Sequence, residues 1–212
     1  MLAHIVEFSD GSKRRLAAEA VPVPLEIAGP WTVEFPPNPG APRSAVFEKL
    51  ESWPRRPEAG IRYFSGTATY TREFKLPAER LGSDREVWLD LGGVQVIAEV
   101  RLNGRDLGIL WKPPFRLNAT SALRPGTNRL EVRVTNLWPN RMIGDEQLPD
   151  SMEWQGKRAL PARWRDWLLK GEPRPDGRVT FCTRKVYDKS APLLDSGLIG
   201  PVRLTSARLL KL

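Results

Sequence analysis

The sequence predicts an all-β fold, an antiparallel β-sandwich, on three observations. Apolar and polar residues alternate over most of the chain, as they do in strands that bury one face. Tight-turn signals separate the alternating stretches, among them Asn103-Gly104, where both residues tolerate a positive φ. Helical periodicity is weak by comparison. At least seven short strands with turns between them are typical of a sandwich.

The strands are predicted in chain order. A short strand is expected at 4–8, before a turn at Asp10-Gly11. The longest is expected at 63–76, where Ala68, Tyr70 and Leu76 fall on one face and threonines on the other. Further alternating stretches follow at 86–91, 94–102, 107–111, 129–134 and 202–209.

Helices and loops occupy the remainder. The best helical candidate is 161–170, which has Pro161 in its first turn and Gly171 just after its end. The proline-rich segments 36–42 and 53–57 are predicted as surface loops. Residues 1–24 are interpreted as an extension or connection, and 25–212 as one domain.

Composition excludes several classes of site. The 33 Lys and Arg residues exceed the 25 Asp and Glu residues, for a net charge of +8. The only cysteine is Cys182, so no internal disulfide can form, and the only histidine is His4. A zinc site or a histidine-dependent catalytic triad is therefore not expected. Because the arginines are scattered among acidic residues, we expect a solvated surface and no nucleic-acid partner.

No apolar run approaches the length of a membrane span, and the first residues show neither the basic region nor the long apolar region of a signal peptide. We therefore expect no membrane partner. We expect a cytoplasmic location for the chain as written, and a periplasmic or extracellular location if it is a piece of a longer enzyme.

Five segments in order resemble a known family. Residues 60–74, 89–94, 100–115 and 123–136, and finally 196–204, resemble the sugar-binding jelly roll of glycoside hydrolase family 2. Residues 29–35 and 136–146 more closely resemble the C-terminal part of enzymes similar to the α-L-rhamnosidases of bacterial glycoside hydrolase family 106. The resemblance covers about 25–207 and implies a galactose-binding-like jelly roll with one or two short helices. Those enzymes carry catalysis on a barrel that a chain of 212 residues cannot contain.

The segment 136–154 is the leading candidate site. It combines flat aromatic rings with amide, guanidinium and carboxylate groups, a mixture suited to covering a pyranose face and bonding its hydroxyls. The resemblance implies that an acidic residue here reaches the sugar. The alternative is that the same side chains merely pin a long loop. The predicted binding residues of the segment are Trp138, Asn140, Arg141, Asp145, Glu146 and Trp154.

Two other places supply further candidates. Trp111 and Lys112 lie at a predicted strand end, before two prolines that cannot continue a ladder. Tyr187 and Asp188 precede the closing strand. A glycosidase would need two carboxyl groups about 5 to 9.5 Å apart, for which the candidates are Asp145, Glu146, Asp150 and Glu153.

Three functional hypotheses remain open: a carbohydrate-binding module, a small glycoside hydrolase that uses two of these carboxylates, and a structural domain that packs on a catalytic barrel. The expected partners are an oligo- or polysaccharide, acidic if the net positive charge guides binding, and a catalytic barrel or a second copy of the chain. No cofactor or protein metal site is predicted, although a structural calcium ion would be compatible with a jelly roll.

Overall fold

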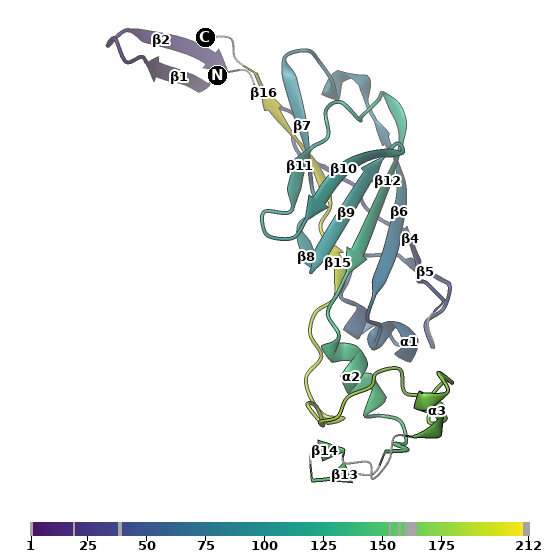
Figure 1. Cartoon of the computed structure of the whole chain (residues 1–212). Helices are drawn as coiled ribbons and strands as arrows, with labels where there is room; N and C mark the ends of the chain where they lie inside the picture. The colour runs from purple at the N-terminus through teal and green to yellow at the C-terminus, as the bar shows by residue number, and fades with distance from the viewer. Residues whose placement is uncertain are drawn as a thin grey trace.

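The computed structural model describes residues 2–18, 20–37, 40–152, 154–156, 158–159 and 165–209. Within them two antiparallel sheets form a sandwich (Figure 1). The larger sheet has six strands in the order β10–β9–β12–β6–β4–β5. Their bounds are β4 (Trp31–Glu34), β5 (Ser44–Phe47), β6 (Thr67–Leu76), β9 (Ile97–Leu102), β10 (Arg105–Leu110) and β12 (Gly126–Thr135).

The smaller sheet has four strands in the order β11–β7–β16–β3. They are β3 (Leu25–Glu26), β7 (Arg85–Asp90), β11 (Arg116–Asn118) and β16 (Arg203–Arg208). A further antiparallel pair joins β15 (Gly197–Gly200) to β8 (Gly93–Gln95). All of these pairings between strands are antiparallel, so the predicted sandwich is confirmed.

The core lies between the two sheets and follows from the alternation. Strand β12 buries every second residue, including Leu130, Val132 and Val134, and β7 buries Val87 and Leu89 from the other side. Because successive strand side chains point to opposite faces, each strand contributes half of its residues to one continuous core. The same alternation leaves charged residues of both signs on the outer faces.

Strand β6 begins at Thr67, four residues later than predicted, because the Tyr63 and Phe64 amides still donate to carbonyls of helix α1 (Ala59–Arg62). The predicted surface loop at 53–57 is also wrong in part. Trp53 begins the 3-10 helix η1 (Trp53–Arg55) and is fully buried. Its indole nitrogen donates to the Tyr70 hydroxyl at 2.6 Å, a partner that local composition could not reveal. A second 3-10 helix, η2, spans Ala78–Arg80.

The N-terminal hairpin stands apart from the sandwich (Figure 1). Strands β1 (Leu2–Glu7) and β2 (Lys13–Ala18) pair across the predicted turn. There the Ser12 amide donates to the Asp10 carboxylate at 2.9 Å, and Gly11 has a φ of 80°. The hairpin lies at the end of the sandwich away from helix α2.

At that other end an insertion follows β12, which we define as 137–195 (Figure 1). It contains helix α2 (Pro139–Asp145), the short pair β13 (Trp154–Gln155) and β14 (Arg158–Ala159), and helix α3 (Asp166–Leu169). The predicted helix 161–170 survives as α3 and ends before Gly171, whose φ is 65°; residues 161–164 lie outside the described residues. The described residues thus hold three short α-helices, where one or two were expected. No helix among the described residues is long and apolar enough to cross a membrane.

Candidate functional site

The candidate site lies at the end of the larger sheet where β10 and β12 end and β9 begins. Thr135 pairs with Ile97, and Leu110 pairs with Ala98, so the residues that follow β12 and β10 leave the sheet at the same end. Trp138 and Trp111 are among them, with 57% and 65% of their surfaces exposed. The structure therefore brings these two predicted binding residues to one end of the sandwich.

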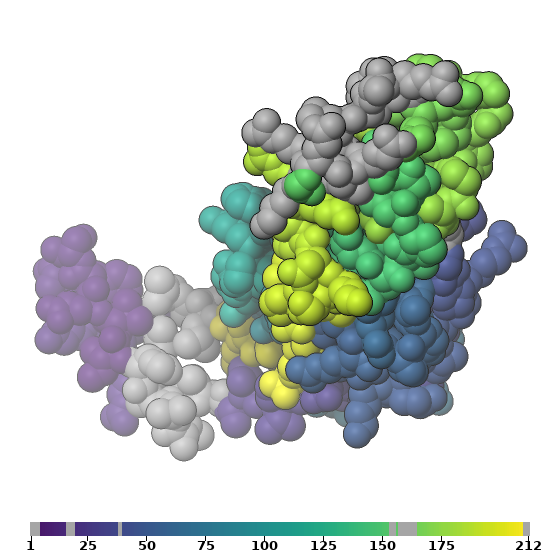
Figure 2. Space-filling view, turned by 90° about the horizontal axis from the view of Figure 1, so that it is seen from below, coloured from purple at the N-terminus to yellow at the C-terminus, as the bar shows by residue number. Residues whose placement is uncertain are grey.

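A hollow of about 250 Å³ is lined by Leu137 and Pro139, the two residues that flank Trp138 in the sequence. Figure 2 looks onto this end and shows the yellow-green segment that leads to β15 lying against the teal residues of the sandwich. The lining combines an amide, a carboxylate and a hydroxyl with apolar side chains, so it offers both kinds of contact that a sugar needs. Its lining residues are Gln95, Val96, Leu137, Pro139, Asn140, Leu194, Asp195 and Ser196.

Asn140 shapes this hollow by fixing the returning chain. Its amide nitrogen donates to the Leu194 carbonyl at 2.7 Å, and its amide oxygen accepts from the Leu194 amide at 2.8 Å. The same nitrogen lies 3.0 Å from the Ser196 hydroxyl. Asn136, one residue after β12, likewise holds Phe64 and Gly66. Both asparagines are buried, so they position the walls of the hollow.

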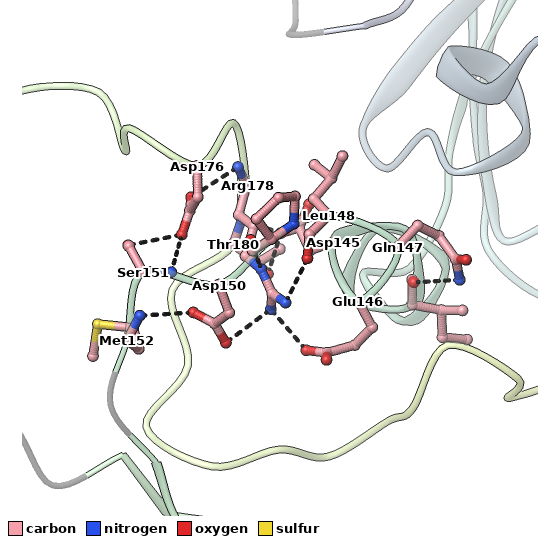
Figure 3. Close-up of polar contacts among 12 residues, drawn as sticks. Asp145, Glu146, Gln147, Leu148, Asp150, Ser151, Met152, Asp176, Arg178 and Thr180 are labelled. Carbon is pink, nitrogen blue, oxygen red and sulfur yellow. Dashed lines mark hydrogen bonds and ion pairs between the residues drawn. The ribbon is translucent and has the colours of Figure 1, made fainter.

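Asp145 lies at the end of α2 and is only 1% exposed (Figure 3). One carboxylate oxygen is 3.0 Å from the Arg141 guanidinium, one helical turn earlier. The other accepts hydrogen bonds from the Val179 amide and from both the amide and hydroxyl of Thr180. Arg141 is also largely buried, so this pair fastens the far side of the insertion to α2.

Glu146 and Asp150 meet arginines that the sequence analysis did not select. Arg178 lies 2.9 Å from Glu146 and 3.3 Å from Asp150 (Figure 3). Arg174 lies 3.2 Å from Asp150. Arg174 also pairs with Asp176 at 2.6 Å. The run from 174 to 178 alternates cation and anion around a proline and a glycine, a pattern that indicates a charged turn and could have drawn attention to it.

Asp176 is held as a carboxylate. Burial raises its pKa, but hydrogen bonds from Arg174 and from the amide and hydroxyl of Ser151 outweigh burial and lower the pKa well below its usual range. We call the six charged residues of this region, together with Arg141, the arginine–carboxylate network. Its members are Arg141, Asp145, Glu146, Asp150, Arg174, Asp176 and Arg178.

The remaining predicted residues fall in different places. The Lys112 ammonium lies 5.4 Å from the centre of the Trp111 ring and close to the exposed end of the sheet. Asp188 accepts from the amide and hydroxyl of Ser190 in a turn, beside the half-buried Tyr187. Trp154 lies in β13, but its side chain and all of Glu153 fall outside the described residues. Among described residues, no group of three His, Cys, Asp or Glu side chains could hold a metal ion.

The carboxylates and the exposed aromatic residues lie in different parts of the candidate site. The carboxylates Asp145, Glu146 and Asp150 all face arginine within the insertion. Trp111 and Trp138 are exposed just after the strand ends, and the hollow there is lined by both apolar and polar residues. Exposed indole rings can stack on a sugar ring, and polar lining groups can bond its hydroxyls.

Known proteins resemble this chain over most of its length. Residues 55–171 match the family model described as the glycosyl hydrolase 2 galactose-binding domain-like family. The chain is 46% identical over 194 residues to a Formosa agariphila protein provisionally named a beta-glucuronidase, covering 92% of this chain and 16% of that protein. A rhamnosidase from Novosphingobium sp. PP1Y has a similar structure, with a TM-score of 0.69 and 36% identity over 92% of this chain and 16% of that one.

A more distant structure agrees in fold. The beta-D-glucuronidase of Dictyoglomus thermophilum gives a TM-score of 0.53 at 16% identity, over 88% of this chain and 28% of that one. The present chain thus spans only about a sixth of the first two proteins.

Proposed function

This chain belongs to the glycosyl hydrolase 2 galactose-binding domain-like family, and from that membership we propose that it is a carbohydrate-binding module that recognises a glycan at the end of its sandwich. The observation that carries the proposal is the exposure of Trp138 and Trp111 at the end of the sheet where a hollow combines apolar and polar lining residues. We call Trp111, Lys112, Trp138 and this hollow the end face.

The chemistry of the end face supports this role. Large exposed indole rings are costly to leave in water and are well shaped to cover the apolar face of a pyranose. Gln95 and Asp195 line the hollow and can bond sugar hydroxyls. The amide of Asn140 is already bonded to Leu194, so we assign Asn140 to positioning the hollow.

We further propose that the preferred glycan carries acidic groups. The chain has a net charge of +8, and Lys112 lies beside the exposed Trp111 ring. In the part of the chain that the structure describes, Lys112 has no carboxylate partner, so its ammonium is available to a uronate. One similar protein is named a beta-glucuronidase, which is consistent with this choice.

The test is glycan binding by the purified chain. Trp138→Ala and Trp111→Ala are each expected to weaken binding about two- to thirteenfold, since each removes a stacking surface that contributes on the order of 0.5–1.5 kcal/mol. Ile5→Ala is the matched control, because Ile5 is an exposed apolar residue on the remote hairpin. Unchanged binding by both tryptophan variants would exclude the end face as the glycan site. Hydrolysis of aryl glycosides that is lost in Glu146→Gln would instead favour the small-hydrolase hypothesis.

A second candidate role is docking to a catalytic domain. Several apolar side chains are exposed at the same end of the sandwich, and the chain spans about a sixth of the Formosa agariphila and Novosphingobium proteins described above. Residues 25–212 would then form the accessory domain, and 1–24 its connection. Loss of binding to the separately expressed remainder of the enzyme, without loss of glycan binding, would favour this role. The exposed apolar residues are Ile97, Ile109, Leu137 and Leu194.

A further inference from the structure

A short segment bridges the two sheets on the flank of the sandwich. Residues 25–29, which we call the strap, begin as β3 on the smaller sheet, where the Ile27 amide donates to the Val202 carbonyl at 2.9 Å. Just after the strap, the Pro30 carbonyl accepts from Arg72 on β6 of the larger sheet at 2.8 Å. The strap therefore crosses the seam between the sheets.

Two hollows open on either side of the strap. The first, of about 490 Å³, combines the apolar residues Ile27, Trp31 and Val202 with Glu48 and Lys49. The second has about 460 Å³ and lies against β6. Both are lined by strap residues 26–29, so they form one interrupted groove, the strap groove. The second hollow is lined by Leu25, Arg72, Glu73, Phe74, Lys75 and Thr127 in addition to the shared residues.

Each hollow is lined by a residue with an unsatisfied donor. Trp31 is 0% exposed, and its indole nitrogen has no hydrogen-bond acceptor among the described residues. The Arg72 Nε is likewise buried and without an acceptor in the described part of the chain, although its Nη1 bonds Pro30. Buried N–H groups are rarely left unpaired, because each costs free energy comparable to a lost hydrogen bond. An oxygen atom of a ligand in each hollow would therefore provide the acceptor that the Trp31 and Arg72 N–H groups lack.

The charges around the groove are balanced. Three acids, Glu26, Glu48 and Glu73, stand against three bases, Lys49, Arg72 and Lys75. Within the described residues, neither Glu48 nor Lys49 has a hydrogen bond or an ion pair from its side chain, and both are exposed. A balanced set of donors and acceptors fits hydroxyl groups better than an anion, which would meet a carboxylate at each hollow.

We propose that the strap groove is a second glycan-binding site, which takes a neutral, hydroxyl-rich sugar. Its oxygens would accept from Trp31 and Arg72, and its hydroxyls would bond Glu48 and Lys49. Both unpaired nitrogens are shielded from solvent, so the floor side chains must shift slightly as the sugar enters. The choice of a glycan as ligand class rests on the proposed function; the position of the site does not, because the end face lies elsewhere on the sandwich.

One titration tests the end face and the strap groove together. The chain has eight tryptophans, so a nitrogen-15 spectrum of the labelled chain resolves eight indole N–H signals, of which Trp31→Phe identifies the one from Trp31. The chain is titrated with L-rhamnose, D-galactose and D-glucuronate, with glycerol as the non-sugar control. We expect a saturable shift of the Trp31 signal with a neutral sugar and none with glycerol.

Two substitutions test whether the shift of the Trp31 signal comes from binding in the strap groove. Lys49→Ala should weaken the response of Trp31 at least about fivefold, as expected for loss of a charge-assisted hydrogen bond. Lys170→Ala, an exposed lysine on the insertion, is the matched control and should change nothing. Thermal unfolding of each variant establishes that it is folded.

The outcomes separate the two proposals. If Trp111 and Trp138 respond but Trp31 does not, the strap groove is excluded and the proposed function stands. If Trp31 responds alone, the strap groove stands and the end face loses its support. If glycerol shifts the Trp31 signal as the sugar does, or if Lys49→Ala leaves that shift unchanged, the strap groove is excluded as a sugar site. If the indole signals of Trp31, Trp111 and Trp138 all stay unchanged, both proposals are overturned.

Discussion

Replacing Asp145 by asparagine separates a structural role from a ligand-binding role. The substitution keeps the shape of the side chain and removes its charge. In the native structure one oxygen lies 3.0 Å from Arg141, and the other accepts from the Thr180 amide and hydroxyl, both at 2.6 Å. The amide of the variant must turn its NH₂ toward one of these donors, so that two donors face each other and at least one is left unpaired.

The magnitude follows from burial. The side chains of Asp145 and Arg141 are 2% and 12% exposed, so solvent can replace little of the lost interaction. Removing one partner of a buried ion pair typically costs about 3–5 kcal/mol. Because the asparagine oxygen still accepts some of these bonds, we expect a cost of about 3 kcal/mol. The loss should fall on the insertion, since Val179 and Thr180 lie there.

Amide hydrogen exchange measures this loss where it occurs. The Val179 and Thr180 amides donate directly to Asp145, so their exchange should accelerate about a hundredfold, which corresponds to about 3 kcal/mol of local opening. Amides of β6 and β12 should be unchanged. Asp106→Asn is the matched control, because Asp106 is exposed and, among the described residues, accepts only from the nearby Gly108 amide.

The reasoning is refuted if Asp145→Asn leaves the exchange of both amides within a factor of two of the parent chain. If such a variant also lost glycan binding, Asp145 would act on the ligand, as the family resemblance implies. If exchange accelerates and binding at the end face persists, the pair serves to hold the insertion.

Three further predictions concern stability. Tyr70→Phe removes the acceptor of two buried donors, the Trp53 indole and the Leu198 amide, and should lower the free energy of unfolding by about 2–4 kcal/mol in urea titrations. Gly197→Ala should destabilise the chain far more than Gly104→Ala: both have positive φ, but a Cβ at Gly197 would lie 2.5 Å from Trp53, whereas nothing lies within 4 Å at Gly104. Because the pKa of Asp176 is lowered in the folded state, its ionised carboxylate stabilises the fold above about pH 4. The melting temperature should therefore fall as the pH drops below that value toward the lowered pKa. Asp176→Asn should remove this part of the acid dependence, and a pH profile that the substitution leaves unchanged would contradict the assignment.

The sandwich could be predicted because its signal is local. Alternation along β6 and β12 is a property of neighbouring residues, and it fixes which face is buried whatever the partner strand is. Pairing order is not local. Strand β6 lies between β12 and β4, and no pattern within β6 specifies either neighbour.

Trp53 shows the limit of local composition. Its neighbours include two prolines and two arginines, which are typical of a surface loop. The tryptophan is nevertheless buried, because Tyr70 provides an acceptor and Gly197 lets the chain pass close to the indole ring. Those partners are 17 and 144 residues away, and only the folded topology brings them together.

Local composition also could not assign the roles of the candidate site residues. In the part of the insertion that the structure describes, few apolar side chains are buried, so other interactions must hold it in place, and paired arginines and carboxylates supply them. The residue types that suit sugar recognition are therefore the same ones that suit pinning a loop, so the sequence could select Arg141 and Asp145 but could not assign their role. Exposure separates the two uses: Asp145 is 1% exposed, whereas Trp138, seven residues earlier, is 57% exposed. Among the predicted ligand residues, those that the fold leaves accessible are the ones whose substitution should change binding without changing stability.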